Sequence, residues 1–204
     1  MPRMRTFLAV EIDPAMRQAA AALQAALGKS VAGVRWAAPA TMHVTLQYLG
    51  EVADRDLHTV CKVVDAVTRR LPPFGLRLGG VGAFPNLRRP KTVWAGVTDG
   101  ATDLQRLFAA LEDGLTEVGA YRREARAYTP HLTLGRVTTE DDNADLAAVL
   151  PKHLTWAGGY TTVEEVMVFT SRLQRDGPEY TPVGRAVLRG RPEADLPPPA
   201  DVAK

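Results

Sequence analysis

Two short stretches of this 204-residue sequence, His43-Val-Thr-Leu46 and His131-Leu-Thr-Leu134, share the pattern histidine, apolar, threonine, apolar. Successive side chains of a β-strand point to opposite faces, and residues two apart lie about 6–7 Å from each other along the backbone. In each stretch the two apolar residues would therefore face a core, while the histidine and the threonine would share the other face. The sequence thus predicts two strands, each presenting one imidazole and one hydroxyl.

The two stretches occupy matching places in two similar halves of the chain. The hydrophobic periodicity of the first half predicts strands at 5–11, 34–37, 41–49 and 75–81 and helices at 14–27 and 53–70. That of the second half predicts strands at 91–97, 131–137, 163–170 and 180–188 and helices at 104–118 and 143–150. The opening strands begin 38 residues before His43 and 40 residues before His131. We interpret this recurrence as a duplicated β-α-β-β-α-β unit.

The predicted fold is α+β and bilobal. We expect one domain over residues 1–190, with lobes at about 1–90 and 91–190 related by pseudo-two-fold symmetry and antiparallel-rich sheets facing a central cleft. Exchange of strands between the lobes is a variant of this arrangement. The proline-rich residues 191–204 are predicted to be a disordered tail.

Composition narrows the class of protein. Hydrophobic residues make up 46% and charged residues 24%, which is ordinary for a globular chain. No apolar run approaches the roughly 20 residues of a membrane span, and the N-terminal residues lack the apolar segment of a signal peptide. A single cysteine excludes an internal disulfide, and the net charge of +2 is too small to indicate nucleic-acid binding by itself. We expect a cytoplasmic monomer that has no membrane partner.

If the two strands meet, the shared face can open a cyclic phosphate. In-line attack needs a base that takes a proton from water and an acid that protonates the departing oxygen, and histidine titrates near neutral pH. We predict that His43 and His131 fill these two roles. The hydroxyls of Thr45 and Thr133 can donate hydrogen bonds to the non-bridging phosphate oxygens, where charge must be stabilised.

Two other interpretations compete with this one. A lone histidine on a strand is usually structural, but packing gives no reason to repeat both His and Thr on an exposed face. A metal site is the other alternative, because histidine is a common ligand. Neither motif is accompanied by a carboxylate or a third histidine at ligand spacing, so we predict no metal and no other cofactor. The remaining histidines, His58 and His153, fit the polar face of a helix and a turn.

Further segments of the chain extend the pattern. They are Arg5-Thr-Phe-Leu-Ala-Val-Glu, Val34-Arg-Trp, His43-Val-Thr-Leu-Gln-Tyr-Leu-Gly-Glu, Gly82-Ala-Phe-Pro, Val93-Trp-Ala-Gly and Tyr128-Thr-Pro-His-Leu-Thr-Leu-Gly-Arg. With these, the chain resembles the two-histidine phosphoesterase superfamily, and within it the bacterial and archaeal RNA 2′,3′-cyclic phosphodiesterases, first called 2′-5′ RNA ligases. The resemblance covers roughly residues 5–189. The chain departs from the family mainly in its proline-rich C-terminal tail.

The resemblance implies a reaction and its participants. It implies a hydrolase that opens 2′,3′-cyclic phosphates at the ends of RNA or tRNA fragments to 2′-phosphomonoesters, without metal or nucleotide. It also implies that His43 is the proton donor toward the 3′ oxygen and that His131 is the proton acceptor for water.

The resemblance further points to three residues around the histidines. Arg136 matches a phosphate-binding arginine, although simple strand alternation would place it on the face opposite His131; a bulge or bend at Gly135 would reverse this. Phe7 and Phe84 match aromatic residues that flank the substrate base, and core packing is the competing interpretation for both.

Two alternative functions remain open at this level. The first is 2′-5′ RNA end-joining, or binding of tRNA ends, by the same two histidines, since a reversible reaction can run toward ligation. The second is an esterase that acts on a cyclic nucleotide or an ADP-ribose derivative, which the Phe-Pro and Val-Trp segments disfavour by resemblance.

Overall fold

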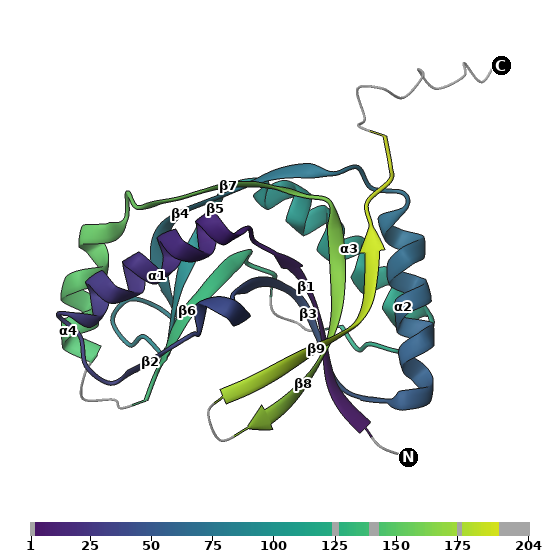
Figure 1. Ribbon diagram of the computed structural model, residues 1–204, viewed down its shortest axis with the longest axis horizontal. Helices are drawn as coiled ribbons and strands as arrows, with labels where there is room; N and C mark the ends of the chain where they lie inside the picture. The colour runs from purple at the N-terminus through teal and green to yellow at the C-terminus, as the bar shows by residue number, and fades with distance from the viewer. Residues whose placement is uncertain (1–2, 124–126, 139–142, 175–176, 192–204) are drawn as a thin grey trace.

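The structure, a computed structural model, describes residues 3–123, 127–138, 143–174 and 177–191. Within these ranges nine strands form one curled sheet in the order β7-β4-β5-β6-β3-β1-β8-β9, with β2 beside β6 (Figure 1). Every strand pair is antiparallel. The strands are β1 (Arg3–Glu11), β2 (Val34–Trp36), β3 (His43–Ala53), β4 (Phe74–Phe84), β5 (Thr92–Asp99), β6 (His131–Val137), β7 (Ala157–Val163), β8 (Glu165–Gln174) and β9 (Gly177–Val187).

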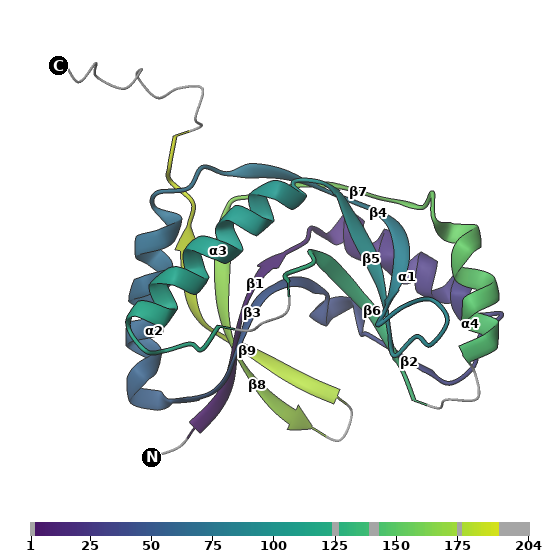
Figure 2. The same ribbon diagram turned by 180° about the vertical axis from the view of Figure 1, so that it is seen from behind.

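Four α-helices and two 3-10 turns lie against this sheet in the described ranges. They are α1 (Pro14–Gly28), α2 (Asp54–Thr68), α3 (Ala101–Glu117), α4 (Asn143–Val149), η1 (Pro39–Thr41) and η2 (Leu150–His153). Figures 1 and 2 show α1 and α4 beside the flank that contains β4, β5 and β7, and α2 beside the flank that contains β8 and β9. Helix α3 packs against α2 and contacts β3 and β5. The predicted mixed α and β architecture with an antiparallel sheet is confirmed.

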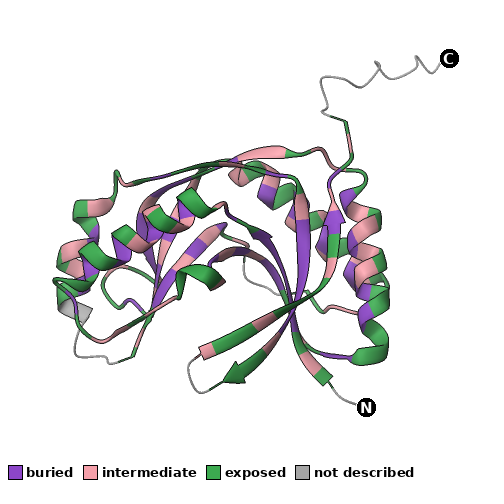
Figure 3. Ribbon diagram, viewed as in Figure 1, coloured by how far each residue is buried: buried purple, intermediate pink, exposed green. Residues whose placement is uncertain are grey.

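Helix α1 shows how the sequence determines an element. Asp13 caps it, because its carboxylate accepts a hydrogen bond from the backbone N–H of Met16 at 3.2 Å, and Pro14 occupies the first turn. Its apolar stripe is buried against the sheet, as its helical spacing predicts. Figure 3 shows the same pattern for the other helices, with buried residues on the side that faces the strands.

The sheet joins the two halves of the chain. Strands β1 and β3 lie beside β8 and β9, and β4 lies beside β5 and β7, so each flank combines strands from both halves. The flanks meet between β3 and β6, which pair through Val44 and Leu132. The prediction of separate sheets facing a cleft is therefore wrong in this respect: a single sheet forms because the two motif strands pair directly.

Other differences from the sequence-based elements are local. The strand β7 has no predicted counterpart, since two glycines interrupt its start and hide the alternation of its Tyr-Thr-Thr-Val end. The boundaries of β3 and β4 extend beyond the prediction, and the proline-rich residues 192–204 lie outside the described residues. In the described part of the chain, none of the helices combines the length and apolarity that crossing a membrane requires.

Candidate functional site

The two motif strands expose their histidines and threonines on one face of the sheet. In β3 and β6 the apolar residues of each motif are at most 3% exposed. The histidine and the threonine of each motif are half-buried. The predicted alternation is therefore confirmed for both stretches.

The strand register places the two pairs next to each other. Val44 lies opposite Leu132 in an antiparallel pair. It follows that His43 is beside Thr133 and that Thr45 is beside His131, because residue numbers run in opposite directions along the two strands. Directly opposite residues of such a pair have Cα atoms about 4.5–5.5 Å apart. The structure thus brings the four predicted motif residues into one group.

Each motif strand contains a register shift just after its threonine. In β3, Ala9 of β1 pairs with Thr45 and Leu8 pairs with Gln47, so that Leu46 is an extra residue. In β6, Trp94 of β5 pairs with Thr133 and Val93 pairs with Gly135, so that Leu134 is extra. An inserted residue of this kind reverses which face the following side chains point to. The same irregularity therefore occurs at the same place in both motifs.

This shift brings Arg136 to the site face. Leu134 and Gly135 are both buried and Arg136 is exposed, whereas unbroken alternation would have placed Arg136 opposite to His131. The predicted bulge at Gly135 is confirmed. Burial lowers the pKa of His131 and raises that of Tyr180, and the Arg136 guanidinium is a smaller influence that lowers both, so its charge lies close to both side chains.

Both imidazoles are oriented in the same way. The Nδ1 atom of His43 lies 2.8 Å from the carbonyl oxygen of Thr41, and that of His131 lies 2.7 Å from the carbonyl oxygen of Thr129. A carbonyl only accepts, so Nδ1 carries the proton in the neutral ring and Nε2 is the nitrogen available for proton transfer. Nε2 of His43 is 3.1 Å from the Thr45 hydroxyl. No described residue makes a corresponding hydrogen bond to Nε2 of His131.

Burial and nearby charges set the protonation of both histidines. Burial lowers the pKa of His43, and the hydrogen bond to Thr41 opposes this effect. Arg17 and His131 lower the pKa of His43 further, while Glu11 raises it. Arg17 and Glu11 form a salt bridge at 3.0 Å, so their effects on His43 largely offset each other.

The charge environment of His131 is less balanced. Burial lowers the pKa of His131, and the hydrogen bond to the Thr129 carbonyl opposes this effect. The Arg136 cation lowers the pKa of His131 further. A neutral imidazole is therefore favoured at this position.

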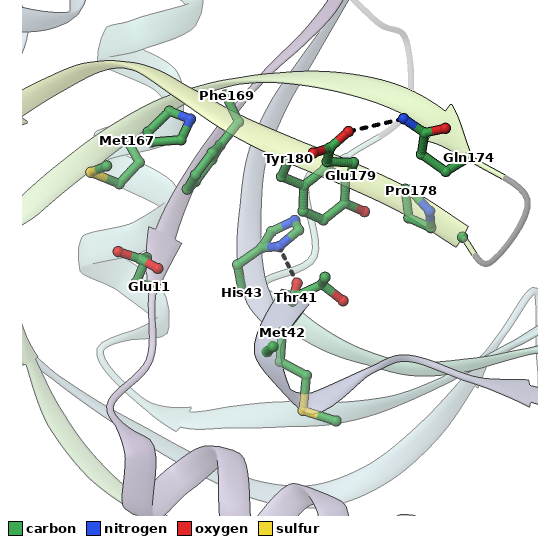
Figure 4. A pocket seen from close by; sticks show the side chains of 13 residues that line it. Glu11, Thr41, Met42, His43, Met167, Phe169, Gln174, Pro178, Glu179 and Tyr180 are labelled. Carbon is green, nitrogen blue, oxygen red and sulfur yellow. Dashed lines mark hydrogen bonds between the residues drawn. The ribbon is translucent and has the colours of Figure 1, made fainter.

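The two histidines line different cavities. His43 contributes to a cavity of about 610 Å³, where Phe169 of β8 and Tyr180 of β9 lie beside the imidazole (Figure 4). His131 contributes to a cavity of about 800 Å³ whose lining includes Phe84 and Tyr128. Each histidine therefore has a hollow beside it.

The two predicted base-flanking residues differ in how they are placed. Phe7 stacks on His43 with ring centroids 4.9 Å apart, and it is only 4% exposed because Phe169 and Tyr180 cover it. Phe84 meets His131 edge to face at 5.0 Å, is half-buried and lines the larger cavity. Phe84 consequently offers a nucleobase more ring surface than Phe7 does.

Several residues near the two histidines were not predicted as site residues from the sequence. Tyr180 lies 5.4 Å from the His43 ring, but it comes from a distant strand and no motif marks it. Tyr128 donates a hydrogen bond to the carbonyl oxygen of Thr45 at 3.0 Å and stacks on Phe108. Tyr48 had a signal in the sequence: it follows His43 by five residues, as Arg136 follows His131.

Metal ligands do not gather at the site within the described ranges. No three His, Cys, Asp or Glu side chains among these residues are placed so that they could hold a metal ion. Metal-independence of the reaction stays a prediction.

The sequence matches a known protein family over most of its length. Residues 33–174 match the model of the 2′-5′ RNA ligase superfamily. An RNA 2′,3′-cyclic phosphodiesterase of Methanothermobacter thermautotrophicus is 34% identical over 88% of this chain and 96% of its own. One of Archaeoglobus fulgidus is 33% identical over 87% of this chain and 96% of its own.

Solved structures agree with the sequence relatives. The protein TT0787 of Thermus thermophilus is 28% identical, with a TM-score of 0.78 over 92% of this chain and 99% of its own. LigT of E. coli, crystallised in complex with 3′-AMP, is 25% identical, with a TM-score of 0.75 over the same shares of the two chains. The curled sheet is thus shared with both of these proteins.

Proposed function

The chain belongs to the 2′-5′ RNA ligase superfamily, and from this premise we propose that it hydrolyses 2′,3′-cyclic phosphates at RNA ends to 2′-phosphomonoesters. One observation carries the proposal. Two imidazoles, each fixed by a carbonyl at Nδ1, present Nε2 on one face across the pair formed by Val44 and Leu132. This arrangement suits a reaction that needs one acid and one base on opposite sides of a phosphorus atom.

The proposed reaction is a single in-line displacement. His131 Nε2 takes a proton from water while the water oxygen forms a bond to phosphorus. The bond between phosphorus and O3′ breaks, and His43 Nε2 donates its proton to O3′. The products are a free 3′ hydroxyl and a phosphate on the 2′ oxygen. Solvent then returns both histidines to their starting protonation states.

The electrostatic environment supports this division of roles. A base must be neutral, and Arg136 together with burial lowers the pKa of His131. The acid must be protonated when it acts. Burial and Arg17 lower the pKa of His43 as well and Glu11 opposes Arg17, so it is the bound phosphate anion that favours the imidazolium there.

Hydrogen-bond donors around the histidines hold the phosphate in this proposal. The hydroxyls of Thr45 and Thr133 donate to the non-bridging oxygens, and the Arg136 guanidinium neutralises their charge. The terminal base stacks on Phe84 in the larger cavity, and Phe7 acts from beneath by fixing the ring of His43. No metal or nucleotide cofactor takes part.

We also propose that the site arose by duplication of a β-α-β-β-α-β unit. The support is the same order of residues along β3 and β6: histidine, buried residue, threonine, extra residue, buried residue and exposed long side chain. In this proposal residues 1–190 form one bilobal domain with pseudo-two-fold symmetry. The chain acts in the cytoplasm on RNA or tRNA fragments, and it acts as a monomer, because one chain supplies both histidines.

Hydrolysis of cytidine 2′,3′-cyclic phosphate by the EDTA-treated protein tests the proposal. The product, separated by chromatography against both monophosphate standards, is expected to be the 2′-phosphate. A dominant 3′-phosphate would mean that the two histidines exchange roles. Activity that disappears with EDTA and returns with a divalent metal would refute the metal-free mechanism. No turnover without a 5′-hydroxyl RNA partner would favour end-joining instead.

A further inference from the structure

A second arginine lies directly beside Arg136. Arg35 of β2 pairs with Arg136 of β6, and opposite residues of an antiparallel pair point to the same face. Val34 and Trp36, on either side of Arg35, pack against the core and would contact any side chain at Gly135. Arg35 therefore points the other way, onto the face that carries Arg136.

The position of this arginine pair relative to the histidines follows from the path of the chain. Strand β2, the turn η1 and strand β3 form one broken strand along β6. Along it Arg35 is opposite Arg136, and His43 comes next, beside Thr133. The arginine pair thus extends the site face beyond the group of histidines and threonines, at one end of it.

Packing does not account for the pair. Both arginines are exposed, and neither forms a salt bridge with a carboxylate among the residues that the structure describes. Like charges directly opposite each other destabilise a sheet. A phosphate bound to each guanidinium group would offset this repulsion. The pair is therefore suited to holding two neighbouring phosphates.

We propose that Arg35 binds the internucleotide phosphate immediately 5′ of the terminal nucleotide, so that the site takes an RNA strand in preference to a mononucleotide. The proposal rests on the function proposed above. Arg136, whose charge acts on His131, holds the cyclic phosphate; Arg35, one strand further out, contacts the next phosphate. A guanidinium matches two phosphate oxygens with two parallel hydrogen bonds.

Three substrates test this assignment: cytidine 2′,3′-cyclic phosphate, the cytidine dinucleotide that ends in a cyclic phosphate, and the same dinucleotide with an uncharged methylphosphonate linkage. We expect the wild-type protein to favour the charged dinucleotide in kcat/KM. Arg35→Gln should lower the ratio of dinucleotide to mononucleotide kcat/KM about tenfold, through KM, by loss of a charge-assisted contact. It should also reduce the slope of log(kcat/KM) for the dinucleotide against log salt by about one.

Arg70→Gln is the matched control, because Arg70 is exposed at the end of α2 and its loss changes the net charge equally. It should leave the ratio unchanged. Removal of like-charge repulsion predicts that Arg35→Gln folds with an unchanged or higher Tm. The inference is overturned if Arg35→Gln lowers kcat/KM for all three substrates equally, or if the methylphosphonate dinucleotide is as good as the charged one. If the wild-type protein hydrolyses none of the three substrates, the proposed function itself is refuted.

Discussion

The two motif strands have nearly the same backbone but different surroundings. In both β3 and β6 the imidazole is fixed by a carbonyl two residues earlier, and in both an extra residue follows the threonine. His43 is enclosed by aromatic rings and is hydrogen-bonded to Thr45 through Nε2. His131 has an Nε2 without a described partner, and a cation acts on it.

The difference teaches how one repeated strand can place two imidazoles in different electrostatic surroundings. The backbone places both imidazoles on one face of the sheet, and the neighbouring side chains give each imidazole a different set of nearby charges. The position five residues after the histidine illustrates this point: it is Tyr48 in β3 and Arg136 in β6. Only the second residue carries a charge, and that charge lowers the pKa of His131.

Removal of either histidine is the strongest test of the comparison. His43→Ala and His131→Ala should each lower kcat/KM by about 10²–10⁴-fold, as expected for the loss of a general acid or base. Both variants should fold, since neither imidazole belongs to the hydrophobic core, and circular dichroism would check this. Near-full activity in either variant would contradict a two-histidine mechanism. Loss of folding in both would show that the histidines are structural.

Valine variants at the two threonines should lose similar amounts of activity, but they should differ in how activity depends on pH. Thr45→Val and Thr133→Val should each lower kcat by about a hundredfold, because each removes one donor to the phosphate oxygens. Only Thr45→Val should also change the pH dependence, since Thr45 is hydrogen-bonded to His43 Nε2. The corresponding serine variants keep the hydroxyl and serve as controls. Identical pH profiles for the two valine variants would argue against this asymmetry.

The charge at Arg136 should influence both rate and pH. Burial lowers the pKa of both histidines below 6.5, so kcat/KM of the wild-type protein should follow a bell-shaped profile with a maximum below pH 6.5. Arg136→Gln removes the cation that disfavours a protonated His131, so the profile should move to higher pH; its two limbs belong to the coupled pair. The loss of a charged hydrogen bond predicts a decrease of about 10–100-fold at the optimum. An unmoved profile would place the Arg136 charge away from His131.

The smallest predicted effect concerns the residue that follows the extra residue in each strand. β3 has Gln47 there, while β6 has Gly135, whose added Cβ would lie 2.7 Å from Val34 and 2.9 Å from Trp36. Gly135→Ala should therefore lower the free energy of unfolding by about 1–3 kcal/mol, measured by denaturant titration.

Gly28→Ala is the matched control for this variant. Its Cβ would approach the same Trp36 side chain at an ordinary 3.4 Å, so stability should be retained. Equal stability of the two alanine variants would mean that β2 can move away from Gly135 without cost.

The sequence alone determined the parts of the protein that depend on local rules. Helix α1 follows from its apolar spacing and the Asp13 cap, and the exposed face of each motif strand follows from alternation. The candidate pair His43 and His131 follows from repetition of the pattern. The helix and the strand faces involve residues that are close in sequence, so periodicity and capping are sufficient to predict them, and the histidine pair needs only a comparison of the two motifs.

Only the tertiary structure decided how these parts meet. The pairing of Val44 with Leu132, the extra residue after each threonine and the placement of Arg35 beside Arg136 all depend on partners far away in sequence. A register shift exists only relative to a neighbouring strand, so a single strand carries no record of it. For the same reason Tyr180 could not be assigned to the site beforehand. Sequence alone determined which side chains are available for chemistry, and long-range strand pairing decided which of them share a face.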